Sequence, residues 1–308
     1  MPVALCNQIP VLNKNWAFGG SMTKRYTIKP QDDRFAVQVS MEDYGEIVQD
    51  AQAVAEMRAL LDRYMVLHIK PEKELTKTVV GDFAFALGYP KERRSAGRRP
   101  SPSPTTVPGY EFVADFGSTA KPNVPEARIP SYIETLHYDG ISGYSMQASF
   151  NTPMTTPNLY VDMRAAYKSL PSRMKKIADT HFALHAVIPP PGSALADFPG
   201  FDAKTAIRRP LVIKHPRTRE PLLYLPKNAM SQIEGMPVDE GRGVLHDLWA
   251  HVNTSKTRYT TTLDHNNLLV WDGLGTTHTN PAYPRDQART SWFLIVPGNF
   301  TDVEGFFA

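Results

Sequence analysis

Short apolar segments, separated by turns that contain proline, glycine and charged residues, recur along the whole chain. This pattern constrains the fold more than any other feature, because segments of this length form buried strands. None approaches the roughly 18 apolar residues of a membrane-spanning helix, so no membrane segment is expected. No unit repeats along the chain, which argues against a solenoid or a propeller. Strands are predicted over 66–69, 110–116, 211–214, 222–225, 259–263, 267–271 and 290–296.

Helical periodicity lies in a few stretches between these strands. A chain of 308 residues can bury one large core, so one domain over 1–308 is expected, with its core over about 45–300. Its class is mixed α/β and rich in sheet. An antiparallel double-sheet jelly roll with flanking helices fits this arrangement. Helices are predicted over 47–64, 82–87, 162–170 and 239–253, and the stretch 175–188 is expected to change from helix to strand.

The composition is that of a globular protein, with 42% hydrophobic and 21% charged residues. The net charge of +3 is small and spread along the chain, so a nucleic-acid partner is not expected. Cys6 is the single cysteine and leaves no internal disulfide to form. The start of the chain shows no secretory signal pattern. A reducing cytoplasm is therefore the expected location.

One basic cluster departs from this even distribution of charge. Arginines and one lysine between 91 and 99 run directly into a stretch of proline, serine and threonine. This composition is typical of an extended, mobile surface loop. The sequence therefore predicts an insertion over 91–109, either a solvated loop or a lid that becomes ordered over substrate.

The triplet His137-Tyr138-Asp139 carries the clearest chemical signal. In a strand, His137 and Asp139 project from one face and can bind one ion, while Tyr138 points away. His278 follows an apolar strand and a glycine-containing turn and is the candidate third ligand. Two histidines and one carboxylate on one face of an ion leave positions for a chelating cosubstrate and O₂. This is the arrangement of non-haem Fe(II) oxygenases.

Arg289 follows His278 in the segment that resumes a strand through Phe293. A guanidinium can form a two-pronged pair with the distal carboxylate of a 2-oxoacid whose other end chelates iron. Two alternatives use the same residues differently. One is a zinc-dependent hydrolase or lyase, because this ligand set also suits Zn²⁺. The other is a non-catalytic jelly-roll binding protein. Arg289 argues against zinc hydrolysis, which needs no oxoacid anchor, and the complete ligand set argues against a protein that has lost its activity.

These residues, in this order, resemble those of the taurine dioxygenase and 2,4-dichlorophenoxyacetate dioxygenase family of Fe(II)/2-oxoglutarate oxygenases. The resemblance covers roughly 45–300. It rests on His137-x-Asp139, on Trp271-Asp272 leading to His278, on Arg289, and on the segment 210–218 followed by 222–224. It implies a double-stranded β-helix, Fe(II) as cofactor, and 2-oxoglutarate and O₂ as cosubstrates. The implied reaction oxidises a C–H bond of a small organic molecule and releases succinate and CO₂. The resemblance leaves a homo-oligomer open.

The carboxylate at Asp139 favours hydroxylation over halogenation, whereas desaturation, epoxidation or ring closure would use the same ligands. Asn158 stands where the family commonly has a threonine that helps to hold the oxoacid, and its amide can still donate a hydrogen bond. Phe293 stands where taurine dioxygenase has an arginine for its sulfonate. A less anionic substrate, such as an amino acid or a specialised metabolite, is therefore expected. The candidate pocket residues are Tyr138, Gly140, Ile141, Ser142 and Phe293.

Most other histidines are interpreted as structural. His68 and His215 lie in or beside apolar strand-like segments, where a satisfied core histidine is the simplest reading. Trp271 and Trp292 lie in apolar strands and are expected to pack in the core rather than to stack on substrate.

Overall fold

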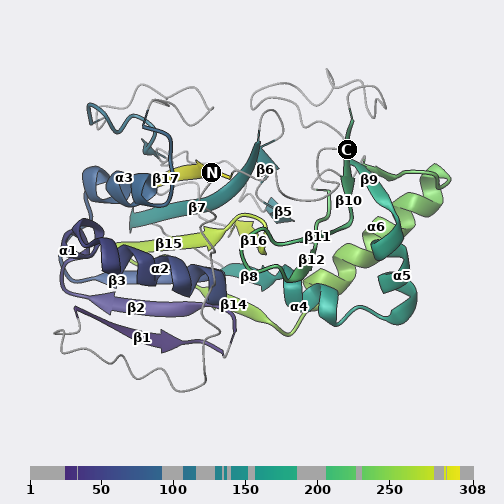
Figure 1. Cartoon of the computed structure of the whole chain (residues 1–308), viewed down its shortest axis with the longest axis horizontal. Coiled ribbons are helices and arrows are strands. Elements are labelled where there is room, and N and C mark those ends of the chain that lie inside the picture. Colours follow the sequence, from purple (N-terminus) through teal and green to yellow (C-terminus); the bar gives the residue numbers. More distant parts are fainter. Residues whose placement is uncertain are drawn as a thin grey trace, which may run out of the picture.

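The computed structural model describes residues 25–32, 34–91, 107–115, 129–133, 135–136, 140–151, 157–185, 206–226, 231–280, 288 and 290–298. For 129–136, 140–142 and 280 this description is of the backbone. Within these ranges the chain is of mixed α/β class and rich in sheet (Figure 1). No helix in this part of the chain is both long and apolar enough to cross a membrane.

The main sheet joins segments from both ends of the chain. Its strands lie in the order β1-β2-β3-β15-β7-β17-β4, and β6 pairs with β7 beside this path. Adjacent strands are antiparallel except β2 and β3, which are parallel because helices connect them. The bounds are β1 Tyr26–Pro30, β2 Val37–Met41, β3 Val66–Pro71, β4 Ala114–Asp115, β6 Thr135–Leu136, β7 Gly140–Asn151, β15 Asn267–Asp272 and β17 Thr290–Pro297.

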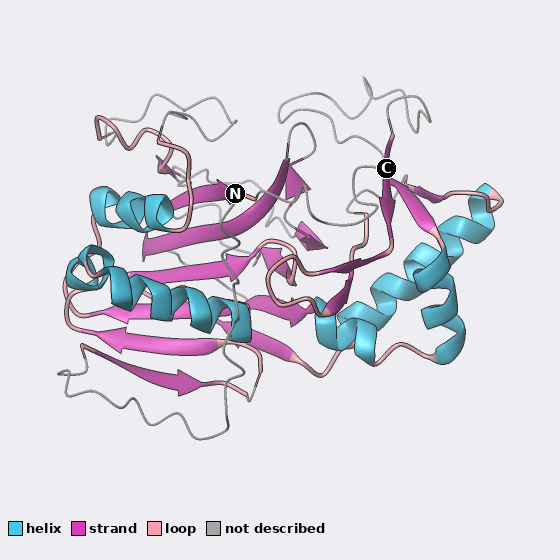
Figure 2. Ribbon diagram, in the orientation of Figure 1, coloured by secondary structure: helices cyan, strands magenta, loops and turns pink. Residues whose placement is uncertain are grey.

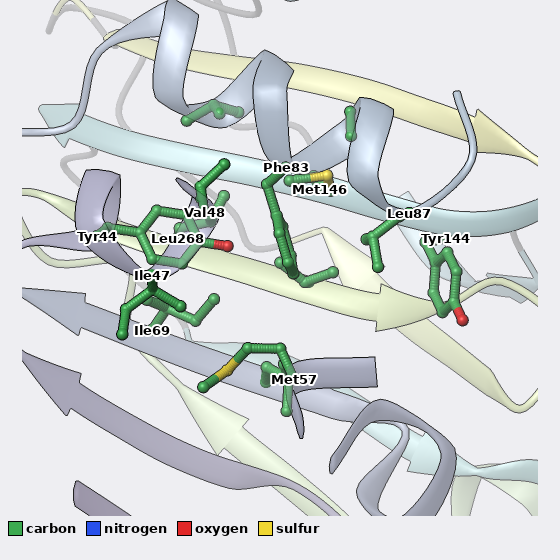
Figure 3. Close-up of a cluster of buried hydrophobic side chains, with 14 of the residues drawn as sticks. Tyr44, Ile47, Val48, Met57, Ile69, Phe83, Leu87, Tyr144, Met146 and Leu268 are labelled. Atoms are coloured by element: carbon green, nitrogen blue, oxygen red, sulfur yellow. The ribbon is translucent and has the colours of Figure 1, made fainter. Parts of the chain in front are cut away.

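Three helices cover one face of the main sheet: α1 (Tyr44–Gln49), α2 (Ala51–Tyr64) and α3 (Lys77–Ala86). They lie in front of it in Figures 1 and 2. Their apolar sides pack on alternate strand residues such as Met146 and Leu268, as Figure 3 shows. The other face of the sheet is left for the second sheet.

The predicted helix over 47–64 is two helices, because Asp50 ends α1 and caps the start of α2. Its carboxylate accepts hydrogen bonds from the backbone N–H groups of Gln52 (2.9 Å) and Ala53 (3.2 Å). An N-cap of this kind begins a new helix rather than continuing one. The predicted start at 82 was also wrong: α3 begins at Lys77, after the N-cap Thr76.

The second sheet packs on the uncovered face of the main sheet. Its order is β14-β8-β16-β5, all antiparallel. Tyr160 and Tyr259 of this sheet meet Leu269 and Trp271 of the main sheet in one buried cluster. This cluster is the interior that the two sheets share. The bounds are β5 Ile129–Ile133, β8 Asn158–Asp162, β14 Arg258–Thr261 and β16 Thr276–Asn280.

A smaller group of elements flanks the second sheet. The chain leaves β8 through α4 (Met163–Lys168) and α5 (Ser172–Thr180) and reaches the three-stranded sheet β10-β9-β13. The hairpin β11-β12 and the helix α6 (Val238–Asn253) pack against these elements around a second apolar core. The strand bounds are β9 Phe182–His185, β10 Ile207–Pro210, β11 Val212–Lys214, β12 Pro221–Leu223 and β13 Gln232–Ile233.

Most of the predicted elements are confirmed, with ends that shift by a few residues. The predicted change from helix to strand in 175–188 is seen as α5 followed by β9. In the range 110–116, the strand is limited to Ala114–Asp115. Strands β1 and β2 were not predicted, and they extend the main sheet to segments before residue 45. Residues 92–106 of the predicted insertion lie outside the described part of the chain.

Candidate active site

His278 lies in the middle of β16. It follows an apolar strand, β15, and a turn, as the sequence indicates. It pairs with Tyr160 of β8 on one side and with Tyr132 of β5 on the other. Residues directly opposite in an antiparallel ladder project from the same face of the sheet. His278 is 4% exposed and therefore projects with Tyr160 into the interior between the two sheets.

Two aromatic rings hold the imidazole of His278 in place. The Tyr160 ring stacks on it with a centroid separation of 5.6 Å and an interplanar angle of 20°. The Trp271 ring, from β15 of the main sheet, lies at 5.1 Å and is tilted by 59°. Contacts from both sheets restrict the rotation of the imidazole, which favours a fixed ligand over a mobile one. Trp271 is buried in the core, as expected.

The other two predicted ligands, His137 and Asp139, come shortly after β5 in the sequence. β5, which pairs with β16, ends at Ile133. The chain then forms β6, whose Leu136 pairs with Gly140 at the start of β7. In the sequence, His137, Tyr138 and Asp139 come between β6 and β7, and they lie outside the described residues. In the part of the chain that is described, no group of three metal-ligating side chains occurs.

Asn158 lies at the start of β8, two residues before Tyr160, so it projects into the same interior as His278. It is 2% exposed. Its amide nitrogen Nδ2 has no hydrogen-bond acceptor among the described residues. A buried donor without an acceptor is unfavourable by about 1–3 kcal/mol, so it marks a place for an oxygen atom of a bound group.

Of the remaining predicted site residues, those that the structure describes belong to the main sheet. Arg289 is outside the described residues, directly before β17. Phe293 is half-buried on β17 and packs on Trp271, with ring centroids 6.3 Å apart. Of the other pocket candidates, Gly140, Ile141 and Ser142 begin β7, whose side chains are described from 143 onward.

A network around Asp272, which sequence analysis did not single out, lies behind the turn before His278. We call Asp272, His215, Arg217, Asp62 and Tyr144 the Asp272 network. His215 Nε2 donates to Asp272 Oδ2 at 3.0 Å, and an Nη2–H of Arg217 donates to the same oxygen. Arg217 Nε also donates to Asp62 of α2 at 2.6 Å, and its guanidinium lies 4.5 Å over the ring of Tyr144. The signal for this network is a carboxylate that directly follows the apolar run 268–271 at the end of β15, because a buried charge needs partners.

The state of these groups follows from their hydrogen bonds. His215 Nδ1 accepts from the backbone N–H groups of Arg217 (3.3 Å) and Thr218 (3.1 Å), so Nε2 carries the proton. Burial alone would raise the pKa of Asp272, but His215, Arg217 and the N–H of Gly275 outweigh it and hold this pKa well below its usual range. Asp272 is therefore an anion fixed in the core. His215 is a structural histidine, as predicted.

One family model and several curated proteins match this chain. The family model described as "Taurine catabolism dioxygenase TauD, TfdA family" matches residues 28–294. An alpha-ketoglutarate-dependent 2,4-dichlorophenoxyacetate dioxygenase of Burkholderia sp. (strain RASC) is 30% identical over 145 residues, or 46% of this chain and 48% of that protein. Pentalenolactone F synthase of Streptomyces arenae is 31% identical over 85 residues, 28% of each chain. The chain spans about half the length, or less, of these curated relatives.

Solved structures with a similar fold cover more of the chain. AAD-2, in complex with Mn(II) and N-oxalylglycine, has a TM-score of 0.67 and 22% identity over 89% of this chain and 98% of its own. A taurine dioxygenase from Burkholderia xenovorans has a TM-score of 0.68 and 19% identity over 89% of this chain and 90% of its own. At this level of identity the likeness concerns the fold.

Proposed function

The chain belongs to the TauD/TfdA family of dioxygenases, and we propose that it is an Fe(II)- and 2-oxoglutarate-dependent dioxygenase that oxidises a C–H bond of a small organic molecule. The family match covers 28–294 and so includes every residue of the predicted site. The observation that carries the proposal is the position of His278, buried between two sheets, with Asn158 on the adjacent strand β8 offering an amide donor that has no acceptor among the described residues. The two facing sheets support a double-stranded β-helix as the core.

The residues present fit an iron and oxoacid site. His137, Asp139 and His278 would hold Fe(II), since two histidines and one carboxylate are the facial donor set of this class of enzyme. Arg289 would pair with the distal carboxylate of 2-oxoglutarate. The buried Nδ2 of Asn158 would donate to an oxygen of the same molecule.

When bound, Fe(II) and 2-oxoglutarate supply the activation of O₂ and release succinate and CO₂. The chain supplies the surroundings. Tyr160 and Trp271 orient the imidazole of His278 and exclude water from one side of it. The Asp139 carboxylate, a ligand too large to leave room for a halide, favours hydroxylation as the outcome.

Phe293 supports a substrate with apolar character. Its ring packs on Trp271, which in turn contacts His278, so an apolar wall extends from the proposed metal ligand to β17. A fully ionised substrate would lose hydration against such a wall without gaining a partner. A neutral or partly apolar amino acid or specialised metabolite is therefore the proposed substrate class, bound by a protein located in the cytoplasm.

The test is an anaerobic titration of the apoprotein with Fe(II) and 2-oxoglutarate, followed by the weak visible metal-to-ligand charge-transfer band. The band should need both additions. It should be lost in His278→Ala and weakened in Arg289→Ala, because one variant lacks a metal ligand and the other lacks the oxoacid anchor.

His246→Ala is the matched control, because the side chain of His246 is 82% exposed on α6 and takes no part in the site. It should give the wild-type band. Tight Zn²⁺ binding, with no band in the wild-type protein, would contradict the proposal and favour a hydrolytic metal site.

A further inference from the structure

The turn that joins β15 to β16 determines where His278 lies in the interior. It comprises residues 273–275, and it carries no side chain larger than that of Leu274. Asp272 Oδ1 accepts hydrogen bonds from the backbone N–H groups of Leu274, at 2.9 Å, and Gly275. The position of this one carboxylate therefore sets the path of the turn and the start of β16.

Close packing fixes the same turn from outside. A Cβ atom on Gly275 would lie 2.4 Å from Sδ of Met65 and 3.2 Å from Oδ1 of Asp272. The backbone N–H of Asp272 in turn donates to the Met65 carbonyl at 2.8 Å. The turn is thus closely packed against Met65 and Asp272, and a movement of the Asp272 carboxylate would displace it through the two N–H hydrogen bonds.

The carboxylate is itself held from two directions by His215 and Arg217. These two residues come from the β11-β12 hairpin, far from β15 in the sequence. Arg217 extends the connection to α2 through Asp62 and lies over Tyr144 of β7. Strand β7 begins at Gly140, directly after the predicted ligand Asp139. One guanidinium thus contacts the residue that shapes the turn before His278 and the strand that follows Asp139.

We infer that Arg217 and His215 are positioning residues for the metal site, acting on His278 through Asp272. This inference rests on the proposed function. Groups hydrogen-bonded directly to a metal ligand commonly change metal affinity by about 10- to 100-fold when they are removed, and residues one contact further away are expected at the lower end of this range. A residue that only stabilised the fold would change the thermal stability and leave the affinity of the folded protein as it was.

The experiment compares Arg217→Met with Arg208→Met. Arg208 on β10 makes the same kinds of contact, since its Nε donates to both oxygens of Glu234 and its guanidinium lies 3.5 Å over the ring of Phe182. Among the described residues, none of these contacts is with the Asp272 network or with the proposed site. Both variants lose an ion pair and a cation–π contact, and Arg217→Met should lower the melting temperature more, because it also removes a partner of the buried Asp272 carboxylate.

Two readouts at low temperature separate the roles. Co(II) replaces Fe(II), and its d–d absorption reports affinity and coordination geometry. Amide hydrogen exchange of the apoprotein reports the opening of the turn over 273–275. Arg217→Met should weaken Co(II) binding by about tenfold, alter the d–d spectrum and speed exchange in the turn. Arg208→Met should change none of these. Arg217→Lys keeps the charge and should recover part of the affinity.

Unchanged Co(II) affinity and spectrum in Arg217→Met, with a lowered melting temperature, would overturn the inference and leave the proposed function intact. A wild-type protein that binds no Co(II) would contradict the proposed function, and the inference would fall with it. His215→Gln is the second test. Its amide can still donate to Asp272, so its loss of affinity should be smaller than that of His215→Leu.

Discussion

Asn158 is proposed to bind the cosubstrate through a single atom, its amide nitrogen Nδ2. Its Nδ2 lies buried without an acceptor among the described residues, so the free protein gains little from this donor. Asn158→Ala should therefore leave the stability of the apoprotein nearly unchanged and weaken 2-oxoglutarate binding to the Fe(II) protein by roughly tenfold, the worth of one hydrogen bond to a charged group. Titration of the charge-transfer band measures the 2-oxoglutarate affinity of the wild-type protein and of the variant, and urea unfolding measures the stability of each apoprotein.

Asn158→Thr is the matched variant, because it keeps a donor at this position and should lose less affinity than Asn158→Ala. A large loss of stability in Asn158→Ala, with 2-oxoglutarate affinity at the wild-type level, would instead make Asn158 a core residue without a role in binding.

His68 gives the molecule a pH dependence that is independent of the metal site. Tyr259 donates to its Nδ1 at 2.6 Å, and its Nε2 donates to Asn267 at 2.9 Å, so the buried ring is neutral. Burial first, and the charge of Lys70 second, lower the pKa of His68 from 6.5 to about 4. Between these two values the unfolded chain binds a proton that the native protein does not bind. Stability should therefore fall as the pH is lowered from 6.5 toward 4.

Urea unfolding at pH 7 and pH 5 measures this effect. The shift predicts that His68 accounts for a loss of roughly 2 kcal/mol over this interval. His68→Phe should be less stable at pH 7, because Tyr259 and Asn267 lose their partner, but it should lose less stability at pH 5 than the wild-type protein does. The exposed-site variant His246→Phe should keep the wild-type loss. Equal losses in His68→Phe and wild type would refute the assignment.

At the scale of elements, the β11-β12 hairpin contains a strained residue. Arg219 has φ of 61°, in the left-handed region that favours glycine, and its side chain is exposed. Its backbone N–H donates to the His215 carbonyl at 2.8 Å, so the turn needs this conformation. Arg219→Gly should raise the free energy of unfolding by roughly 0.5–1 kcal/mol, once the larger freedom of glycine in the unfolded chain is subtracted.

Lys214→Gly is the control for this change, because Lys214 is an exposed residue of β11 with ordinary strand geometry. That variant should be less stable than the wild-type protein. Urea unfolding of both variants tests the pair, and a loss of stability in Arg219→Gly would show that the arginine side chain makes a contribution that outweighs the strain.

The elements that could be predicted are those with a strong local signal. The apolar runs of β3 and β15 and the stripe of Leu245, Leu248 and Val252 on α6 were read directly from the sequence. Strand β2 was not predicted, although Val37, Val39 and Met41 alternate with polar residues. The strand is short, and its burial depends on contacts with β3 and the helices, which the sequence does not show. The break at Asp50 was missed because the helical period continues across the cap.

At the scale of the whole molecule, sequence order predicted His278 as a metal ligand that follows an apolar strand and a turn. The structure places its side chain in the interior between the two sheets, and its role as a ligand stays a prediction. Sequence could not predict the Asp272 network. Its members come from α2, β7, the β11-β12 hairpin and β15, and only strand pairing and packing bring them together. A charge pair between residues 217 and 272 leaves no local pattern in the sequence, whereas a His-x-Asp triplet does.

The proposed site draws on both sheets, and this predicts how ligands affect the stability of the molecule as a whole. His278 and Asn158 lie on the second sheet, whereas Asp139 and Arg289 directly precede strands β7 and β17 of the main sheet. Mn(II) and N-oxalylglycine, the pair bound in the similar structure AAD-2, should therefore stabilise the packing between the sheets. At about 100 times the dissociation constant this amounts to roughly 2.7 kcal/mol, or a rise in melting temperature of about 5 °C.

Differential scanning calorimetry tests this, with Mn(II) alone and N-oxalylglycine alone as controls. The full rise should need both ligands, because the metal provides the second attachment point for the oxoacid. It should be absent in His278→Ala. The transition should also remain single, since a ligand that joins the two sheets stabilises them together. An equal rise in His278→Ala would place the ligands elsewhere, and a second transition that appears on binding would show that the two sheets unfold independently and that the site belongs to one of them.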